Sequence, residues 1–95
     1  MSGSHPGDTA TVIEVGSSTS SEKFLDPNNN RVGFMVFNDS TSILYIKYGE
    51  DAASDSYTVK VAAGGYFENS FPSYRGPVYG VWSAENGHAY VTEIS

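Results

Sequence analysis

The stretch of sequence that decides the fold lies at residues 31–38 and reads RVGFMVFN. In a β-strand, successive side chains point to opposite faces. Phe34 and Val36 therefore share one face of the predicted strand. Met35 and Phe37 share the other face. Because both faces are apolar, we expect a central strand or a strand that is covered at an interface.

Two pairs of neighbouring strands are expected to form antiparallel hairpins. The strand described above is followed by a polar turn and then by a second apolar strand, ILYIKY, at residues 43–48. The other pair lies at residues 78–82 and 88–94. The Asn86-Gly87 pair separates these two strands, and Asn-Gly between β-patterned segments is a strong hairpin signal.

Shorter stretches with the same pattern predict further strands, and no stretch is long enough to predict a stable helix. They lie at residues 10–15, 23–25, 57–61 and 65–69. Seven to eight short strands at this spacing are typical of an antiparallel β-sandwich, of jelly-roll or Ig-like topology. We therefore expect an all-β fold in which residues 10–95 form a single β-sandwich domain.

The N-terminal part of the sequence is polar and rich in serine. Residues 1–9 are expected to be a flexible arm or, in part, a remnant of a cloning vector. Residues 10–15 predict an edge strand, but the whole segment 10–25 offers little apolar surface to bury. We therefore expect residues 10–25 to reach away from the main body and to order on contact with a neighbouring subunit.

Composition narrows the classes of function. In this chain of 95 residues, 7 Tyr, 5 Phe and 1 Trp must supply much of a single hydrophobic core. The net charge is −6 and the five basic residues are dispersed, so nucleic acid is not an expected partner. The absence of cysteine excludes disulfides and thiolate chemistry. No apolar run reaches about 18 residues, so no membrane association is expected.

Two small groups of polar residues were weighed for chemistry. Glu50, Asp51 and Asp55 carry oxygen ligands suited to calcium, but their spacing does not match an EF-hand loop, so a solvated acidic loop is expected. His5 and His88 are the only imidazoles, and no nucleophile elbow, paired-histidine zinc motif or phosphate-binding loop accompanies them. We therefore expect no metal, no cofactor and no enzymatic activity.

The aromatic residues could stack on sugar rings, anchor a protein interface or fill the core. Phe67 and Trp82 are assigned to the core. The loop at 71–77 is assigned to an interface, because its prolines restrict the chain and lower the entropy cost of binding. The predicted interface residues are Phe71, Tyr74, Arg75, Tyr79, Ile43 and Tyr45. Tyr74 and Arg75 are expected at its centre, where an arginine can pair with a carboxylate of the partner.

Five segments carry a resemblance that covers about two thirds of the chain. They are RVGFMVFN at 31–38, LYIKYG at 44–49, VKVAAGGYFE at 59–68, YRGPVYGVW at 74–82 and, after the Asn-Gly pair, AYVTE at 89–93. Their order resembles that of small β-sandwich structural proteins of tailed bacteriophages, particularly head-decoration or cement proteins.

The resemblance implies a non-enzymatic virion structural protein that binds the major capsid protein or another virion protein. It also implies a homo-oligomer, for which a trimer is expected. Strands with apolar residues on both faces favour an oligomer for a separate reason, since one face needs cover. The residues alone leave a second function open, namely a carbohydrate- or receptor-binding β-sandwich, for example of a tail fibre.

Overall fold

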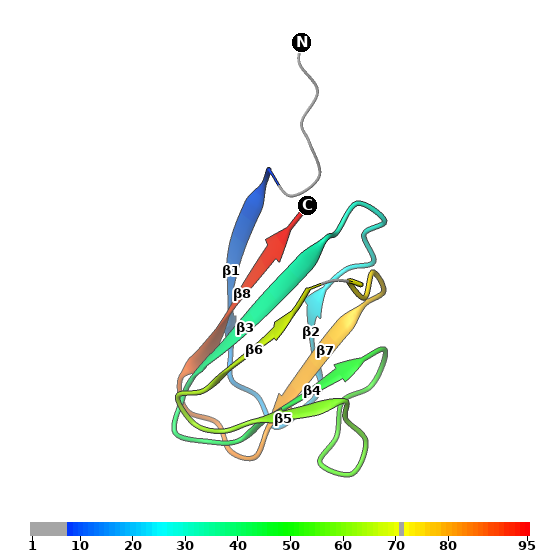
Figure 1. Cartoon of the computed structure of the whole chain (residues 1–95). Helices are drawn as coiled ribbons and strands as arrows, with labels where there is room; N and C mark the ends of the chain where they lie inside the picture. Colours follow the sequence, from blue (N-terminus) through cyan, green and yellow to red (C-terminus); the bar gives the residue numbers. More distant parts are fainter. Residues whose placement is uncertain (1–7, 71) are drawn as a thin grey trace.

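The structure is a computed structural model that describes residues 8–70 and 72–95. These residues form eight β-strands and no helix, which confirms the predicted all-β class (Figure 1). Among them, accordingly, no apolar helix of membrane-spanning length is found. Residues 1–7, most of the predicted flexible arm, lie outside the described residues. The strands are β1 (Ala10–Gly16), β2 (Glu22–Leu25), β3 (Gly33–Asp39), β4 (Leu44–Tyr48), β5 (Val59–Val61), β6 (Tyr66–Asn69), β7 (Val78–Trp82) and β8 (His88–Ile94).

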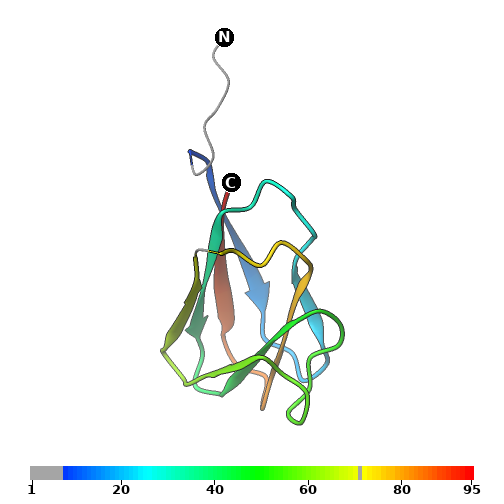
Figure 2. The same ribbon diagram turned by 45° about the vertical axis from the view of Figure 1, so that its right-hand side comes forward.

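The strands divide into two four-stranded antiparallel sheets that pack face to face (Figures 1 and 2). The first sheet has the order β1-β8-β3-β6, and the second sheet has the order β2-β7-β4-β5. β1 pairs with β8, β2 with β7, β3 with β6 and β4 with β5, so the chain resembles one long antiparallel hairpin rolled into a sandwich. This order is that of a jelly roll, which confirms the predicted β-sandwich and selects one of its two expected topologies.

Both predicted hairpins are wrong, although their strands are present. β3 belongs to the first sheet and β4 to the second, and β7 and β8 are divided in the same way. Gly87 does adopt the left-handed conformation that a tight turn needs, with φ of 77°. The turn nevertheless crosses from one sheet to the other. After a turn, the next strand can pair with the previous strand in the same sheet, or it can cross to the other sheet. Either strand buries one set of alternating side chains, so the local pattern does not distinguish the two connections.

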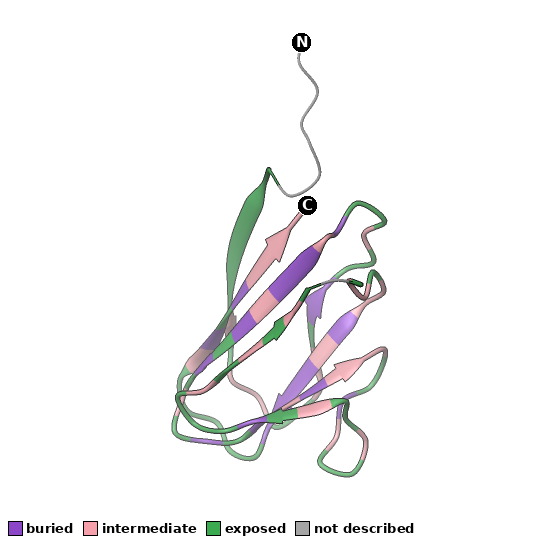
Figure 3. Cartoon of the chain, viewed as in Figure 1, coloured by how far each residue is buried: buried purple, intermediate pink, exposed green. Residues whose placement is uncertain are grey.

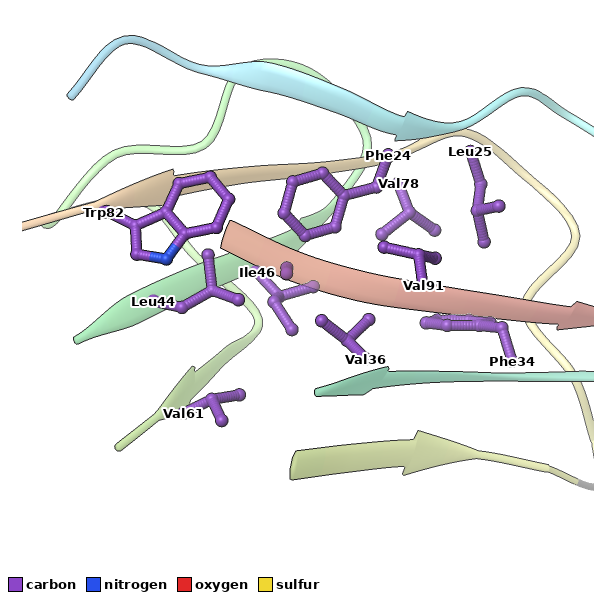
Figure 4. Packing of buried hydrophobic residues seen from close by; sticks show 11 residues of the cluster. Phe24, Leu25, Phe34, Val36, Leu44, Ile46, Val61, Val78, Trp82 and Val91 are labelled. Atoms are coloured by element: carbon purple, nitrogen blue, oxygen red, sulfur yellow. The ribbon is translucent and has the colours of Figure 1, made fainter. Parts of the chain in front are cut away.

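The core lies between the two sheets and follows the predicted alternation. Phe34 and Val36 face it from β3, and Leu44 faces it from β4. Figure 4 shows these side chains pointing toward one another between the sheets. Trp82 is buried and Phe67 packs against the core, which confirms both core assignments. The remaining buried members of the cluster are Phe24, Leu25, Ile46, Val61, Val78, Ala89 and Val91.

Residues 10–25 belong to the sandwich, so the prediction that they reach away as an arm is wrong. β1 pairs with β8 in an unbroken register of seven residue pairs. β2 pairs with β7, and its Phe24 and Leu25 lie in the core. The prediction failed because two buried side chains and a ladder of backbone hydrogen bonds are enough to hold a short polar segment on a sheet.

One end of the sandwich is closed around Arg31, whose side chain is fully buried. Its Nε donates to Oε2 of Glu93 on β8 at 2.8 Å. Its Nη1 donates to the carbonyl oxygens of Tyr74 and Gly76 at 2.8 and 2.9 Å, and its Nη2 donates to the carbonyl oxygen of Asp26. One guanidinium therefore joins β8, the loop before β7 and the loop after β2.

The opposite end is closed around Asn38, which is also fully buried. Its Nδ2 donates to the carbonyl oxygens of Ser42 and Ala62 at 2.8 and 3.1 Å. Its Oδ1 accepts hydrogen bonds from Nε1 of Trp82 at 3.1 Å and from Oγ of Ser40 at 2.7 Å. A single amide therefore joins the turn after β3, the turn after β5 and the end of β7.

Gly80 on β7 is expected to tolerate no side chain, because the ring of Phe24 lies over it. A Cβ placed at Gly80 would lie 2.8 Å from Cε1 of Phe24, inside van der Waals contact. We expect Gly80→Ala to lower the free energy of unfolding by about 1 to 3 kcal/mol, measured as a lower melting temperature. Gly16→Ala is the matched control, because nothing lies within 4 Å of a Cβ at that position. Equal losses in both variants would contradict the packing argument.

Candidate functional site

The outer face of the first sheet carries three neighbouring aromatic side chains, Tyr66, Phe37 and Tyr90, which we call the aromatic row. In the strand register, Phe37 of β3 stands directly opposite Tyr66 of β6 and directly opposite Tyr90 of β8. Directly opposed residues share one face of a sheet. Val36, the residue before Phe37, is fully buried, so the aromatic row lies on the outer face.

The rings of the aromatic row are open to solvent. Tyr66 is 67% exposed, Phe37 37% and Tyr90 39%. Figure 3 shows exposed and half-buried segments along the strands of this sheet. A single exposed apolar residue is ordinary on a protein surface, whereas three adjacent large rings form a patch. The patch is supported by regular strands, so its geometry is fixed before any partner arrives.

One end of the aromatic row is bordered by His88 and two carboxylates. The rings of His88 and Tyr90 meet edge to face, with their centroids 4.7 Å apart. Nδ1 of His88 lies 3.3 Å from Oε2 of Glu14, and Nε2 lies 3.0 Å from Oδ2 of Asp39. The contact with Asp39 is close but lacks the geometry of a hydrogen bond. The two carboxylates flank the imidazole and add negative charge beside the row.

The other side of the aromatic row continues into a small apolar hollow. Met35 lies two residues from Phe37 on the same face, opposite Glu68 of β6. Residues of β3, β6 and β8 beside Met35 line a hollow of about 140 Å³. Gly33, which has no side chain, is part of its lining. The outer face therefore offers rings, an apolar hollow and carboxylates side by side.

The predicted centre of the interface, Tyr74 and Arg75, lies in the loop before β7. The ring of Tyr74 is half-buried, because it stacks on Tyr48 with centroids 4.4 Å apart and packs against the core. Arg75 is exposed, and its Nε donates to the carbonyl oxygen of Arg31 at 3.1 Å. The loop borders an open hollow of about 520 Å³. Phe71 lies outside the described residues.

The other predicted interface residues lie elsewhere. Tyr79 and Tyr45 belong to the second sheet, where Oη of Tyr79 donates to Oε1 of Glu50 at 2.8 Å. The ring of Tyr45 packs against Tyr57 with centroids 5.0 Å apart. Ile43 is exposed at the turn before β4. Tyr45 and Tyr79 stand at diagonal positions on the outer face of the second sheet, whereas Tyr74 and Arg75 lie in the loop before β7. The role of the predicted interface residues in docking stays a prediction.

The acidic loop at 50–55 exposes its three carboxylate residues and is tied down by the residue between them. Ala52 is buried, and its N–H donates to Oγ of Ser21 at 2.9 Å. Nζ of Lys47 donates to the carbonyl oxygen of Asp51 at 3.3 Å. Over residues 8–70 and 72–95, no group of three or more histidine, aspartate or glutamate side chains converges as a metal site would require.

Two tyrosines have raised pKa values, for different reasons. The hydrogen bond to Glu50 raises the pKa of Tyr79, and desolvation and the negative charge of Glu50 raise it further. Burial raises the pKa of Tyr48, and the hydrogen bond from Asn69 only partly opposes this. Since an ordinary tyrosine already ionises near pH 10, both phenols stay protonated and uncharged at neutral pH.

Sequence reasoning did not single out the aromatic row. Phe37 was recognised as lying on the face opposite Phe34, and Tyr66 and Tyr90 belonged to the general set of aromatic residues. What was missing was the pairing of β3 with β6 and β8, which places Phe37 opposite residues 29 and 53 positions further along the chain. The alternation within residues 31–38 was the one signal that pointed to a second apolar face.

Comparison of the chain with protein-family profiles, with curated protein sequences and with solved structures gives no match.

Proposed function

We propose that this chain is a non-enzymatic binding protein that docks on another protein through the outer face of the first sheet, and that it decorates or cements the head of a tailed bacteriophage. The observation that carries the docking proposal is the aromatic row, three exposed aromatic residues at directly opposed positions of a regular sheet. The fold alone would not carry it, because jelly rolls serve in capsid proteins, lectins and enzymes alike.

The aromatic row has the properties of an interface anchor. Aromatic side chains bury a large apolar area and have few rotatable bonds, so little side-chain entropy is lost on binding. Tyr66 and Phe37 stand on paired strands, so the backbone needs no ordering either. In protein interfaces, truncation of such a residue typically costs about 2 kcal/mol or more.

The charge of the first sheet defines the partner. Glu14, Asp39 and Glu68 lie on the same face as the aromatic row, as the register shows. β1, β3, β6 and β8 contain no lysine or arginine. A complementary partner surface is therefore basic, with apolar pockets for the rings. Because opposite charges attract over a range that salt shortens, docking should weaken as ionic strength rises.

The assignment to a virion rests on the resemblance of the segments between residues 31 and 93 to phage head-decoration proteins. A flat, open sheet face suits attachment to the broad surface of an assembled shell. The proposed partner is the major capsid protein or another virion protein, and the proposed location is the virion.

The second candidate function, carbohydrate binding, is favoured by one observation. Carboxylates border the aromatic row at Glu14, Asp39 and Glu68, where they could accept hydrogen bonds from sugar hydroxyls while a sugar ring stacks on an aromatic side chain. A receptor-binding module of a tail fibre would use such a surface.

Replacement of Tyr66 with alanine tests the docking surface. We expect Tyr66→Ala to weaken co-sedimentation with purified tailed-phage capsids by about 30-fold, the equivalent of about 2 kcal/mol, with an unchanged melting temperature. The melting temperature should hold because 67% of Tyr66 is already in solvent. Phages of several types, stripped of their own decoration proteins, supply the capsids. A glycan array is screened with the same protein.

Tyr57→Ala is the matched control, because Tyr57 is also exposed, at 41%, but packs against Tyr45 on the second sheet. Full binding by this variant is expected. Loss of capsid binding in Arg75→Ala, with Tyr66→Ala unaffected, would move the docking site to the loop before β7. Binding to glycans that Tyr66→Ala abolishes, without capsid binding, would establish the second candidate instead.

A further inference from the structure

The edge of the first sheet at β1 is long and regular. Within the described residues, β1 pairs with β8 alone, so its other side presents free backbone groups. Six of its seven residues are exposed and the seventh is half-buried, as the green colour along β1 in Figure 3 shows. Val12 is 59% exposed and Ile13 39%. Such an edge is a ready template for another strand.

The hydrogen bonds at the two ends of β1 show which backbone groups are free. Thr9 and Ser95 exchange both backbone hydrogen bonds, and the N–H of Ser17 donates to the carbonyl of Gly87. In an antiparallel pair, bonded and non-bonded residues alternate. The odd-numbered residues between positions 9 and 17 therefore bond to β8. The even-numbered residues direct their N–H and C=O groups to the free edge: Ala10, Val12, Glu14 and Gly16.

The other three sheet edges are protected in ways that β1 is not. β5 has only three residues and carries Lys60. β2 has four residues, carries Lys23 and contains a break in register. β6 has four residues and carries Glu68. Short length, charge and bulges all discourage the addition of a strand. β1 has seven residues, one charged side chain and an unbroken register.

The sequence of β1 is self-complementary in one antiparallel register, the one centred on Ile13. In that register Ile13 faces Ile13 of a second copy, and Thr11 faces Val15. All three are β-branched residues that favour cross-strand contact. All four free-edge residues find partners, because Ala10 faces Gly16 and Val12 faces Glu14. A register centred on Glu14 would oppose two carboxylates, and one centred on Val12 would pair fewer residues.

The charge of β1 does not prevent this pairing. Its one charged side chain, Glu14, already lies 3.3 Å from the imidazole of His88. In the Ile13-centred register, Glu14 faces the apolar Val12 of the second copy rather than another acid. The overall charge of −6 on each copy still opposes association at long range, and salt screens this electrostatic repulsion.

We propose that two copies of this chain associate by antiparallel pairing of their β1 strands, centred on Ile13, so that the two four-stranded sheets form one continuous sheet. The pairing has two-fold symmetry and gives a dimer, not the trimer that the phage resemblance implies. It does not depend on the docking proposal, because it uses backbone groups at the sheet edge and leaves the aromatic row uncovered.

The mass of the full chain in solution tests the stoichiometry. Sedimentation equilibrium from about 1 µM to about 1 mM should show a monomer of 10.2 kDa passing to a species of twice that mass, with tighter association at higher NaCl concentration. A monomer throughout this range overturns the proposal, and so does a trimer. Weaker association with added salt also overturns it, because that sign requires opposite charges at the contact.

Amide hydrogen exchange tests which edge is used. At the monomer concentration, the N–H groups of Val12 and Glu14 should exchange fast, while those of Thr11 and Ile13 are protected by β8. As the dimer forms, the even-numbered amides should become protected as well. Dimerisation without their protection places the contact elsewhere and overturns the proposal. Their protection at all concentrations, in a monomer, shows that a segment of the same chain covers the edge and also overturns it.

Charge variants at Val12 test the register without altering a buried group. Val12→Lys would face Glu14 of the second copy and should tighten the dimer about threefold to tenfold, while Val12→Glu should weaken it by a similar factor. Ser54→Lys is the control for net charge, because Ser54 is exposed in the loop between β4 and β5. Equal effects of Val12→Lys and Ser54→Lys would overturn the Ile13-centred pairing.

Discussion

Replacing Arg31 with methionine is expected to lower the free energy of unfolding by about 3 to 5 kcal/mol, because the variant takes the donor away from every acceptor around this fully buried position. Glu93 would lose its ion pair, and the carbonyl oxygens of Asp26, Tyr74 and Gly76 would lose their hydrogen bonds. A domain of this size commonly has a total stability of about 5 to 15 kcal/mol, so much of the population should unfold well below the melting temperature of the parent chain.

Urea unfolding followed by circular dichroism measures this loss. Arg75→Met is the matched control, since Arg75 is exposed in the loop that Arg31 holds and makes one hydrogen bond, to the carbonyl oxygen of Arg31. The control should lose about 1 kcal/mol or less. Arg31→Lys should lose nearly as much free energy of unfolding as Arg31→Met. A lysine ammonium group cannot donate to a carboxylate and three carbonyls in the directions in which the guanidinium donates. If Arg31→Met and Arg75→Met lower the free energy of unfolding by the same amount, the hydrogen bonds of the buried Arg31 are not a source of stability.

Asn38→Ala is the second substitution with a large expected effect. We expect it to lower the free energy of unfolding by about 3 kcal/mol. The amide joins three segments, and its removal takes a buried hydrogen-bond partner from the N–H of Trp82 and from the carbonyls of Ser42 and Val61. Asn38→Asp should be nearly as harmful, because a carboxylate cannot donate to those carbonyls and would be charged at a fully buried position.

Thermal unfolding monitored by fluorescence is a convenient measurement, since Trp82 is the single tryptophan and bonds directly to Asn38. Asn86→Ala is the control. Asn86 is exposed and makes two side-chain hydrogen bonds at the same end of the sandwich, so its replacement should cost about 1 kcal/mol or less. A melting temperature for Asn38→Ala that stays within the range of the control would contradict the assigned role.

The strands and the core were predictable from sequence because both depend on local alternation. Phe34 and Val36 were predicted to share one face of a strand at residues 31–38, and both lie in the core. Which strands pair with each other could not be predicted in the same way. The Asn86-Gly87 pair has the expected turn conformation at Gly87. Whether the chain then forms a hairpin in the same sheet or crosses to the other sheet depends on contacts between distant segments, such as the hydrogen bond between Asn38 and Trp82.

Buried polar residues were the least predictable part of the fold. Arg31 begins an apolar stretch of the chain, yet nothing near it in sequence shows that Tyr74, Gly76 and Glu93, 43 to 62 positions further on, are among its partners. The candidate site could not be predicted from sequence for the same reason. Phe37 and Tyr90 stand opposite each other only because β3 pairs with β8, and a set of aromatic residues taken one by one does not reveal a row.

The pairing of the first strand with the last has a mechanical consequence. β1 begins and β8 ends at the same end of the sandwich, where Thr9 and Ser95 exchange their hydrogen bonds (Figure 1). A tension applied to the two termini therefore acts across the β1–β8 ladder, and the bonds open one after another from that end, as in a zipper. We expect the domain to yield to a small pulling force in this direction, whereas a load spread over the outer face of a sheet presses on all four strands at once.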